Sequence, residues 1–252
     1  MIFMDEENNP VEAAEKPKSE ENIIVIKKTK IIIAFAAAII IIGAIIGYRL
    51  FFTSNPDGKV EYIANYSSVL GNANATVYVI EFSDYECPYC QASEGENQEV
   101  ISRLKEGDPA WEAPMPKVIE DYVNTGKVKL VFRNFPLHTN SKEAALAAKC
   151  AQEQGKFWEY HQLLFKNYDA LTSTDLKKYA VDLNLNLSQF NQCLDSNKYQ
   201  NNIDNDMKDG DALGVSGTPT FFVGNEEKGY EKVVGAQSFS VFKQIIDSKI
   251  SV

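Results

Sequence analysis

Cys87 and Cys90 are separated by Pro88 and Tyr89, and they follow an apolar run at residues 77–82. A strand that delivers such a pair to the start of a helix suits thiol–disulfide exchange. The first turn of a helix has unpaired N–H groups and the positive end of the dipole, and both stabilise a thiolate. Pro88 suits the first helical position, where an N–H would have no partner. We therefore expect Cys87 to be the attacking sulfur and Cys90, one turn further on, to resolve the mixed disulfide.

Glu81 lies in the middle of the apolar run, where an isolated carboxylate would be costly to bury. It either faces a wet edge of the sheet or serves as a proton acceptor for Cys90, with a raised pKa. Asp84 and Glu86 stand closer to the cysteines. We interpret them as solvated charges that mildly oppose thiolate formation.

Two other uses of the cysteine pair remain open. Half a zinc site would need two more ligands, and the candidates, none in paired spacing, are His138, His161, Cys150 and Cys193. A structural disulfide across two intervening residues would add little stability. Redox chemistry is favoured over both, and we expect no metal. His138 either touches the site or simply ends a strand, and we favour the second; we interpret His161 as a packed helical residue.

The remaining elements can position this pair. Short apolar or alternating runs indicate strands at residues 76–83, 128–132, 220–223 and 232–234. Helical patterns occur at residues 91–105, 117–123 and 239–250, and as a block across 141–213. Without the block, the order is β-α-β followed by β-β-α.

The first 52 residues differ from the rest. Residues 1–22 carry seven acids against two lysines, a composition typical of a disordered tail. The 18 residues at 31–48 have no charge and approach the length of about 20 that a membrane span needs. The lysines before this span place the N-terminus in the cytoplasm by the positive-inside rule. A cleaved signal peptide is the competitor, but no small-x-small site follows. We expect a cytoplasmic tail at 1–30, an uncleaved anchor at 31–52 and a tether at 53–75.

Size and charge limit the part outside the membrane. A net charge of −10 argues against a nucleic-acid surface, which needs clustered lysine and arginine. The length after residue 52 suits one domain with a large insert. We divide it into core at 76–140, helical insert at 141–213 and core again at 214–252.

Four segments together resemble DsbA-like thioredoxin-fold disulfide oxidoreductases. They are VYVIEFSDYECPYC at 77–90, RNFPLH at 133–138, KCAQEQGKFWEYHQLLF at 149–165 and GVSGTPTFFVG at 214–224. The resemblance extends from about residue 70 to 252, except for 93–116. It implies an α/β thioredoxin fold with an inserted helical domain, here preceded by a single transmembrane helix.

The resemblance also implies roles for individual residues. Cys87 would be the nucleophile, Cys90 the resolving thiol and Glu81 the buried acid behind them. Cys150 and Cys193 correspond to a second, non-catalytic disulfide of some family members. Such a bond would stabilise the fold by about 4 kcal/mol; two buried free thiols are the alternative.

A second group of residues would contact substrate. Thr218-Pro219 corresponds to a loop whose cis proline packs against the cysteine pair, which exposes the backbone of Thr218 to an extended substrate segment. We expect Pro88 and Tyr89 to contact substrate as well. The stretch 107–116 departs from the family pattern. It is either a tolerated surface insertion or an exposed loop that offers Trp111 and Met115 to substrate.

These inferences predict a membrane-anchored thiol-disulfide oxidoreductase that faces out of the cytoplasm. It would oxidise reduced or unfolded exported proteins through a mixed disulfide at Cys87. A membrane quinone-linked partner would reoxidise it, and no organic cofactor is needed. A reductase or isomerase on the same fold, and a non-catalytic peptide-binding module, remain alternatives.

Overall fold

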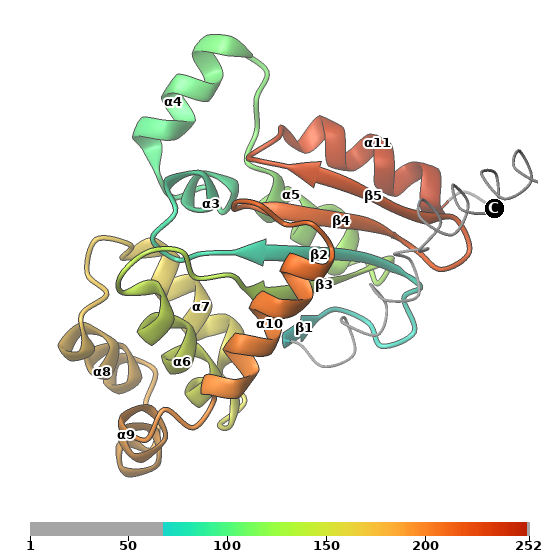
Figure 1. The fold of residues 1–252 in the computed structure, drawn as a ribbon. Coiled ribbons are helices and arrows are strands. Elements are labelled where there is room, and N and C mark those ends of the chain that lie inside the picture. Colours follow the sequence, from blue (N-terminus) through green and yellow to red (C-terminus); the bar gives the residue numbers. More distant parts are fainter. Residues whose placement is uncertain (1–67, 251–252) are drawn as a thin grey trace, which may run out of the picture. The chain divides into compact units, whose positions relative to one another are not determined.

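The computed structural model describes residues 68–250, so the expected tail and anchor lie outside the described residues. Its centre is a five-stranded sheet in the order β1-β3-β2-β4-β5 (Figure 1). The strands are β1 (Ser68–Leu70), β2 (Val77–Ser83), β3 (Val128–Asn134), β4 (Thr220–Asn225) and β5 (Gly229–Val234). β2 runs parallel to β3, and the other neighbours are antiparallel. β1 falls in the stretch expected to be tether, yet it pairs with β3 and so belongs to the sheet.

β2 is the central strand and is buried along its whole length. Because side chains alternate along a strand, Val77, Val79 and Glu81 face one side of the sheet and Ile80 faces the other. The two sides belong to separate hydrophobic clusters, one containing Val79 and the other Ile80. This placement explains the continuous apolar run in the sequence.

Helices cover both faces of the sheet (Figure 1). α5 (Pro114–Val118), the π-helix η1 (Ile119–Val123) and α11 (Phe239–Ile250) pack with the Val79 side. α10 (Gln200–Ala212) contributes Met207 to the cluster on the Ile80 side. The remaining helices between β3 and β4 are α6 (Ser141–Gln152), α7 (Phe157–Lys166), α8 (Ser173–Asp182) and α9 (Leu187–Asp195). Within residues 68–250, no helix has the length and apolar character that crossing a membrane requires.

The helix expected at 91–105 is two helices, so that prediction was wrong. α3 (Pro88–Ser93) ends early, and α4 (Gln98–Gly107) begins separately and stands out from the fold (Figure 1). Gly95 lies between them with φ +86°, a left-handed conformation that glycine adopts without steric cost. Asn97 then caps α4 by accepting a hydrogen bond from the Val100 amide at 3.1 Å.

The next helix begins earlier than the pattern at 117–123 predicted, so the prolines of 107–116 do not delay it. α5 begins at Pro114 itself and includes Pro116 at its third position. Proline is tolerated in a first turn because the N–H groups there have no intrahelical partner.

Candidate active site

Cys87 and Cys90 lie where β2 delivers the chain into α3. Cys87 is the N-cap residue of α3, with Pro88 at the first helical position as expected. Its amide donates to the Asp84 carbonyl at 3.1 Å, which closes the turn between strand and helix. Both sulfurs are thiols, and both residues are buried. The local sequence therefore places the cysteine pair at the first turn of α3.

The two thiols differ in acidity. A hydrogen bond from Cys90 is the main cause that lowers the pKa of Cys87 to about 6, and the Thr218 side chain adds to it. Backbone N–H groups of the first helical turn contribute in the same direction. Burial is the main cause that raises the pKa of Cys90. At neutral pH the pair therefore holds one thiolate, on Cys87, and one thiol, on Cys90.

The loop before β4 reaches the same place from the far end of the sequence. The Thr218–Pro219 peptide bond is cis, as the resemblance implied. The Thr218 carbonyl oxygen lies 3.3 Å from the Cys87 sulfur. Pairing of Thr220 with Phe82 fixes this loop beside the end of β2. The structure thus brings Thr218 against Cys87, with Pro219 joined to it by the cis bond, and their contact with substrate stays a prediction.

Glu81 is fully buried, so the alternative of a wet sheet edge is wrong. Burial, followed by the charge of Glu94, raises its pKa to about 8. Its field in turn contributes to the raised pKa of Cys90. At neutral pH Glu81 therefore holds a proton that it can give to a Cys90 thiolate. It can accept a proton from Cys90, as we expected, only once it has lost its own, so the acceptor role stays a prediction.

Asp84 is buried, and its interpretation as a solvated charge was wrong. Its carboxylate accepts hydrogen bonds from the amides of Leu137 and His138 at 2.6 and 3.1 Å, and from the Ser141 hydroxyl. The His138 ring also meets it, with 2.8 Å between Nδ1 and Oδ2. Asp84 thereby fastens the segment after β3 to the start of the active-site turn.

Glu86 is not merely solvated either. Its carboxylate accepts from the amides of Asn140 and Ser141 at 2.6 and 2.9 Å. These amides belong to the start of α6, where a negative charge is favourable. Glu86 therefore couples the active-site turn to α6.

His138 does more than end a strand. The ring is half-exposed, and the hydrogen bond to Asp84 is the main cause that raises its pKa. The field of Cys87 contributes in the same direction, so imidazole and sulfur act on each other. The alternative that His138 touches the site is therefore the correct one, although the sequence could not name its partner, because Asp84 lies 54 positions away.

Glu94 is a residue that sequence reasoning missed. It is the C-cap residue of α3, and its amide donates to the Cys90 carbonyl at 3.0 Å. Burial raises its pKa to about 8, and the charge of Glu96 adds to the effect. Its spacing of one helical turn from Cys90 was a usable signal, since such residues share a helix face.

The two remaining cysteines form the disulfide that the resemblance implied. Cys150 of α6 and Cys193 of α9 are bonded, with 5.8 Å between their Cα atoms. The bond therefore ties two helices of the block together. Within residues 68–250, no group of three or more His, Cys, Asp or Glu residues is arranged to hold a metal ion.

Two side chains of the stretch 107–116, Trp111 and Met115, are buried rather than offered to substrate. Trp111 is buried among Val100, Ile101 and Ala236, and its indole N–H donates to the Ala236 carbonyl at 3.0 Å. Met115 is fully buried in the cluster beneath α11. The idea that these two residues contact substrate was wrong, because both anchor the insertion to the fold.

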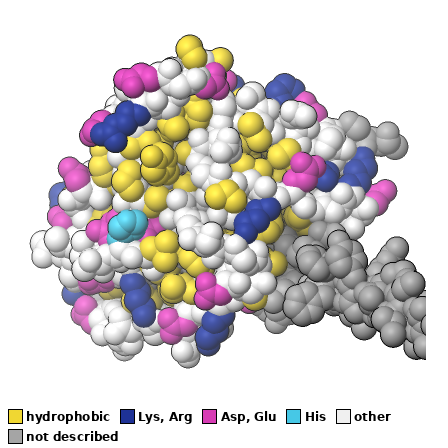
Figure 2. All heavy atoms as spheres, turned by 45° about the horizontal axis from the view of Figure 1, so that its top comes forward, with side chains coloured by type: hydrophobic (Ala, Val, Ile, Leu, Met, Phe, Trp, Pro, Cys, Tyr) yellow, Lys and Arg dark blue, Asp and Glu magenta, His cyan; other side chains and the backbone are white. Residues whose placement is uncertain are grey.

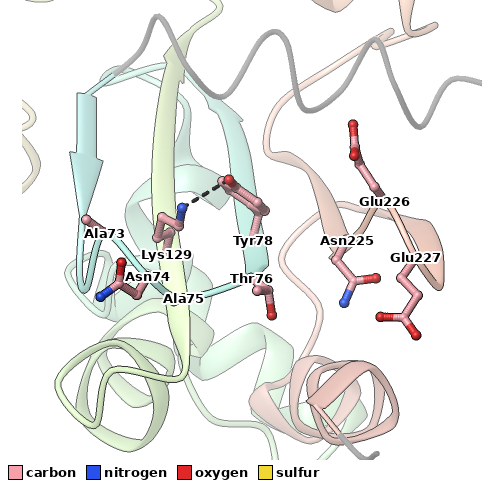
Figure 3. A pocket seen from close by; sticks show the side chains of 9 residues that line it. All are labelled: Ala73, Asn74, Ala75, Thr76, Tyr78, Lys129, Asn225, Glu226 and Glu227. Atoms are coloured by element: carbon pink, nitrogen blue, oxygen red, sulfur yellow. Dashed lines mark hydrogen bonds between the residues drawn. The ribbon is translucent and has the colours of Figure 1, made fainter.

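A hollow of about 370 Å³ lies at the opposite end of β2 (Figure 3). Its lining consists of Ala73, Asn74, Ala75, Thr76, Tyr78, Lys129, Asn225, Glu226 and Glu227. The Lys129 ammonium donates to the Tyr78 hydroxyl at 3.0 Å across one wall. No expected site residue takes part, since the cysteine pair follows the other end of the strand.

Comparison with known proteins agrees with this geometry. A family model described as thioredoxin matches residues 63–108 and 109–248. The chain belongs to the thioredoxin family. Among solved structures, this thioredoxin-family chain resembles alpha-DsbA1 of Wolbachia pipientis, with 25% identity and a TM-score of 0.59 over 73% of this chain and 91% of that one. A thioredoxin-like oxidoreductase from Silicibacter pomeroyi DSS-3 is 29% identical, with a TM-score of 0.54 over 72% and 91% of the two chains.

One curated relative is named as an antiporter and not as an oxidoreductase. The Na(+)/H(+) antiporter NhaA 3 of Salinispora tropica is 38% identical over 158 residues, which cover 62% of this chain. The match spans only 21% of the antiporter, about a fifth of its length. The thioredoxin-family fold and the similar oxidoreductase structures suggest thiol-disulfide oxidoreductase activity for this chain.

Proposed function

We propose that the protein is an oxidase that introduces disulfides into other proteins through Cys87. The observation that carries this proposal is the contrast between Cys87, whose pKa is lowered to about 6, and Cys90, whose pKa is raised. A stabilised thiolate favours the reduced form of the pair, and a protein with a stable reduced form is a strong oxidant.

The chemistry proceeds in two exchanges. A substrate thiolate attacks the Cys87 sulfur of the oxidised pair, the Cys87–Cys90 bond breaks, and Cys90 leaves as a thiolate that takes up a proton. A second substrate thiolate then attacks the substrate sulfur of the mixed disulfide and releases Cys87 as a thiolate. Two electrons remain on the protein as the reduced pair. We expect a membrane quinone-linked partner to remove them.

The surroundings of Cys87 support an unfolded or reduced protein as substrate. Three large hydrophobic side chains are 52%, 53% and 54% exposed: Tyr89, Leu137 and Val234. Tyr89 follows Cys87 in α3, Leu137 donates its amide to Asp84, and Val234 pairs with Thr220 beside the cis-proline loop. Figure 2 shows hydrophobic side chains gathered on the face that includes α3. Exposed apolar groups around a reactive sulfur favour extended polypeptide segments.

An extracytoplasmic location belongs to the same proposal. The apolar span at 31–52 would anchor the protein, with the thioredoxin-family domain outside the cytoplasm and the tail inside. The Cys150–Cys193 disulfide supports this placement, because such bonds persist in oxidising compartments. Protease treatment of intact cells checks it: the domain should be digested while a tag at the N-terminus stays protected.

A reductase is the second candidate, and Glu81 is the observation that favours it. In a reductase the Cys90 thiol must lose a proton before it attacks the mixed disulfide, and Glu81 can accept that proton when its carboxyl is ionised. The reduction potential of the pair separates the two functions. We expect a value near −120 mV for an oxidase, whereas a value near −270 mV would establish a reductase.

The activity itself needs a direct test. The oxidised protein should introduce disulfides into a reduced, unfolded test protein, and Cys87→Ser should abolish this. Cys90→Ser should lose it as well, because this variant has no Cys87–Cys90 disulfide for a substrate thiolate to attack; offered an oxidised substrate instead, its Cys87 thiolate should form a mixed disulfide that no second active-site thiol resolves. Retained oxidation by the Cys87→Ser protein would refute the mechanism.

A further inference from the structure

Proton supply to Cys90 is a problem that the fold creates. Cys90 and Glu81 are each 0% exposed, so neither meets solvent. Each cycle nevertheless protonates the Cys90 sulfur when it leaves the disulfide and deprotonates it on reoxidation. Glu81 can exchange one proton with Cys90, but it must then recover or lose that proton through another group.

Glu94 is an acid that interacts with Glu81 and is itself partly open to solvent. Its amide is bonded to the Cys90 carbonyl, so it stands one helical turn below the resolving thiol. Its side chain is 11% exposed, in contrast to the fully enclosed Glu81. Each of the two carboxyls acts on the pKa of the other. Three carboxyl oxygens lack a hydrogen-bond partner of normal geometry within residues 68–250: both oxygens of Glu81, and Oε1 of Glu94.

The side of Glu94 that faces the interior is neutral. His161 Nε2 lies 3.6 Å from Glu94 Oε1, and His161 Nδ1 lies 3.2 Å from the Tyr85 hydroxyl. Burial lowers the pKa of His161 to about 4 and raises that of Tyr85, so both are uncharged at neutral pH. If Tyr85 donates to Nδ1, the ring proton sits on Nε2 and points at Glu94. Neither group supplies a charge that would let both acids ionise together, so the pair retains a proton.

We propose that Glu94 conducts protons between Glu81 and solvent, and so determines how fast Cys90 is protonated and deprotonated. When Cys90 leaves as a thiolate, the Glu81 carboxylic acid gives it a proton. The resulting Glu81 carboxylate takes the proton of Glu94, and Glu94 recovers one from water. No electrons move along this chain, since the electron pair stays on the sulfur. Reoxidation sends one proton back by the same route.

This inference rests on exchange at the cysteine pair, whichever direction the electrons take. Glu94 acts on Cys90 through Glu81, so it is a positioning residue. A glutamine at position 94 keeps the size of the side chain but cannot pass a proton. An aspartate keeps the acid on a shorter side chain.

The test compares Glu94→Gln, Glu94→Asp, Glu81→Gln and the double glutamine variant. Glu106→Gln is the matched control, because Glu106 is exposed on α4. Reduction of the Cys87–Cys90 disulfide by glutathione is followed by acid quench and thiol alkylation between about pH 5 and 9. Glu94→Gln should slow it by about tenfold or more, and Glu94→Asp should recover part of the loss. The double variant should be no slower than Glu81→Gln, because both acids belong to one chain.

Three outcomes would overturn the inference: a wild-type rate in Glu94→Gln, additive losses in the double variant, or equal losses in Glu94→Gln and Glu94→Asp. Carbon NMR of labelled glutamate offers a readout that does not depend on activity. The pKa of Glu81 should fall in Glu94→Gln, because the charge that raises it is gone. An unchanged titration also overturns the inference. Failure of the wild-type protein to exchange would instead refute the proposed function.

Discussion

The imidazole of His138 rests on the carboxylate of Asp84, with 2.8 Å between Nδ1 and Oδ2. The carbonyl of the same Asp84 accepts the Cys87 amide at 3.1 Å. Asp84, a buried acid, therefore contacts both the half-exposed His138 and Cys87, the cysteine that we expect to attack. Because the hydrogen bond to Asp84 raises the pKa of His138, the ring retains a positive charge closer to neutral pH than a free histidine does.

Replacing this histidine should make Cys87 less acidic. In His138→Gln, loss of a positive charge near the sulfur removes stabilisation of the thiolate, so the pKa of Cys87 should rise by about half a unit to one unit. Thiolate absorbance near 240 nm, followed against pH in the reduced protein, measures the shift. Lys105→Gln is the control, since this lysine is exposed on α4. An equal shift in both variants would mean that the effect is long-range charge rather than the Asp84–His138 pair.

The two active-site thiols should react at different pH values. Alkylation of the reduced protein should modify Cys87 first, with a rate that rises through a midpoint at about pH 6. Cys90 should resist alkylation in the folded protein, because it is buried and its pKa is raised. Peptide mapping by mass spectrometry identifies the modified residue. A Cys87 midpoint near 8.5, the value of an ordinary thiol, would favour the non-catalytic peptide-binding module.

Glu81 should make the protein less stable as pH rises. Its folded pKa of about 8 exceeds the ordinary value of 4.5, so the folded protein holds a proton that the unfolded chain has released. The stability that this proton provides is complete below pH 4.5 and is lost as pH rises through 8. Glu81→Gln should therefore gain free energy of unfolding relative to wild type across this range.

Urea unfolding of the oxidised protein at several pH values measures the difference between the two proteins. Glu106→Gln should instead run parallel to wild type. The effect of Glu81→Gln should level off once the pH exceeds the folded pKa. Parallel curves for wild type and Glu81→Gln would show that Glu81 does not titrate abnormally.

The Cys150–Cys193 bond should contribute to stability without taking part in exchange. Cys150→Ala with Cys193→Ala should lower the free energy of unfolding by about 2 to 4 kcal/mol, because the unfolded chain gains freedom when the loop is no longer closed. Equilibrium unfolding in urea measures the loss. The alkylation rate of Cys87 should stay near that of wild type and serves as the check that the site is intact. Unchanged stability would contradict the prediction.

Local patterns in the chain determined much of the fold and of the site. The apolar run ending before Cys87 predicted a buried central strand, and that strand is β2. Pro88 predicted a helix start, and α3 begins there. Such features depend on neighbouring residues alone, through strand alternation, helix periodicity and the missing N–H of proline. The break between α3 and α4 escaped prediction because Gly95 costs little inside a helical pattern until its positive φ is known.

The sequence by itself determined which residues we expect to carry the chemistry: a Cys-x-x-Cys pair, an acid six residues before it and a proline loop far beyond it. Only the tertiary structure decided which side chains surround that pair. Asp84 meets His138 across 54 positions because β2 and β3 run side by side and end together. Glu94, at the end of α3, lies 3.6 Å from His161 of α7. Burial raises the pKa of Glu81 and Cys90, and hydrogen bonds shift those of Cys87 and His138, since the free energy of a charge depends on the atoms around it and not on its neighbours in the chain.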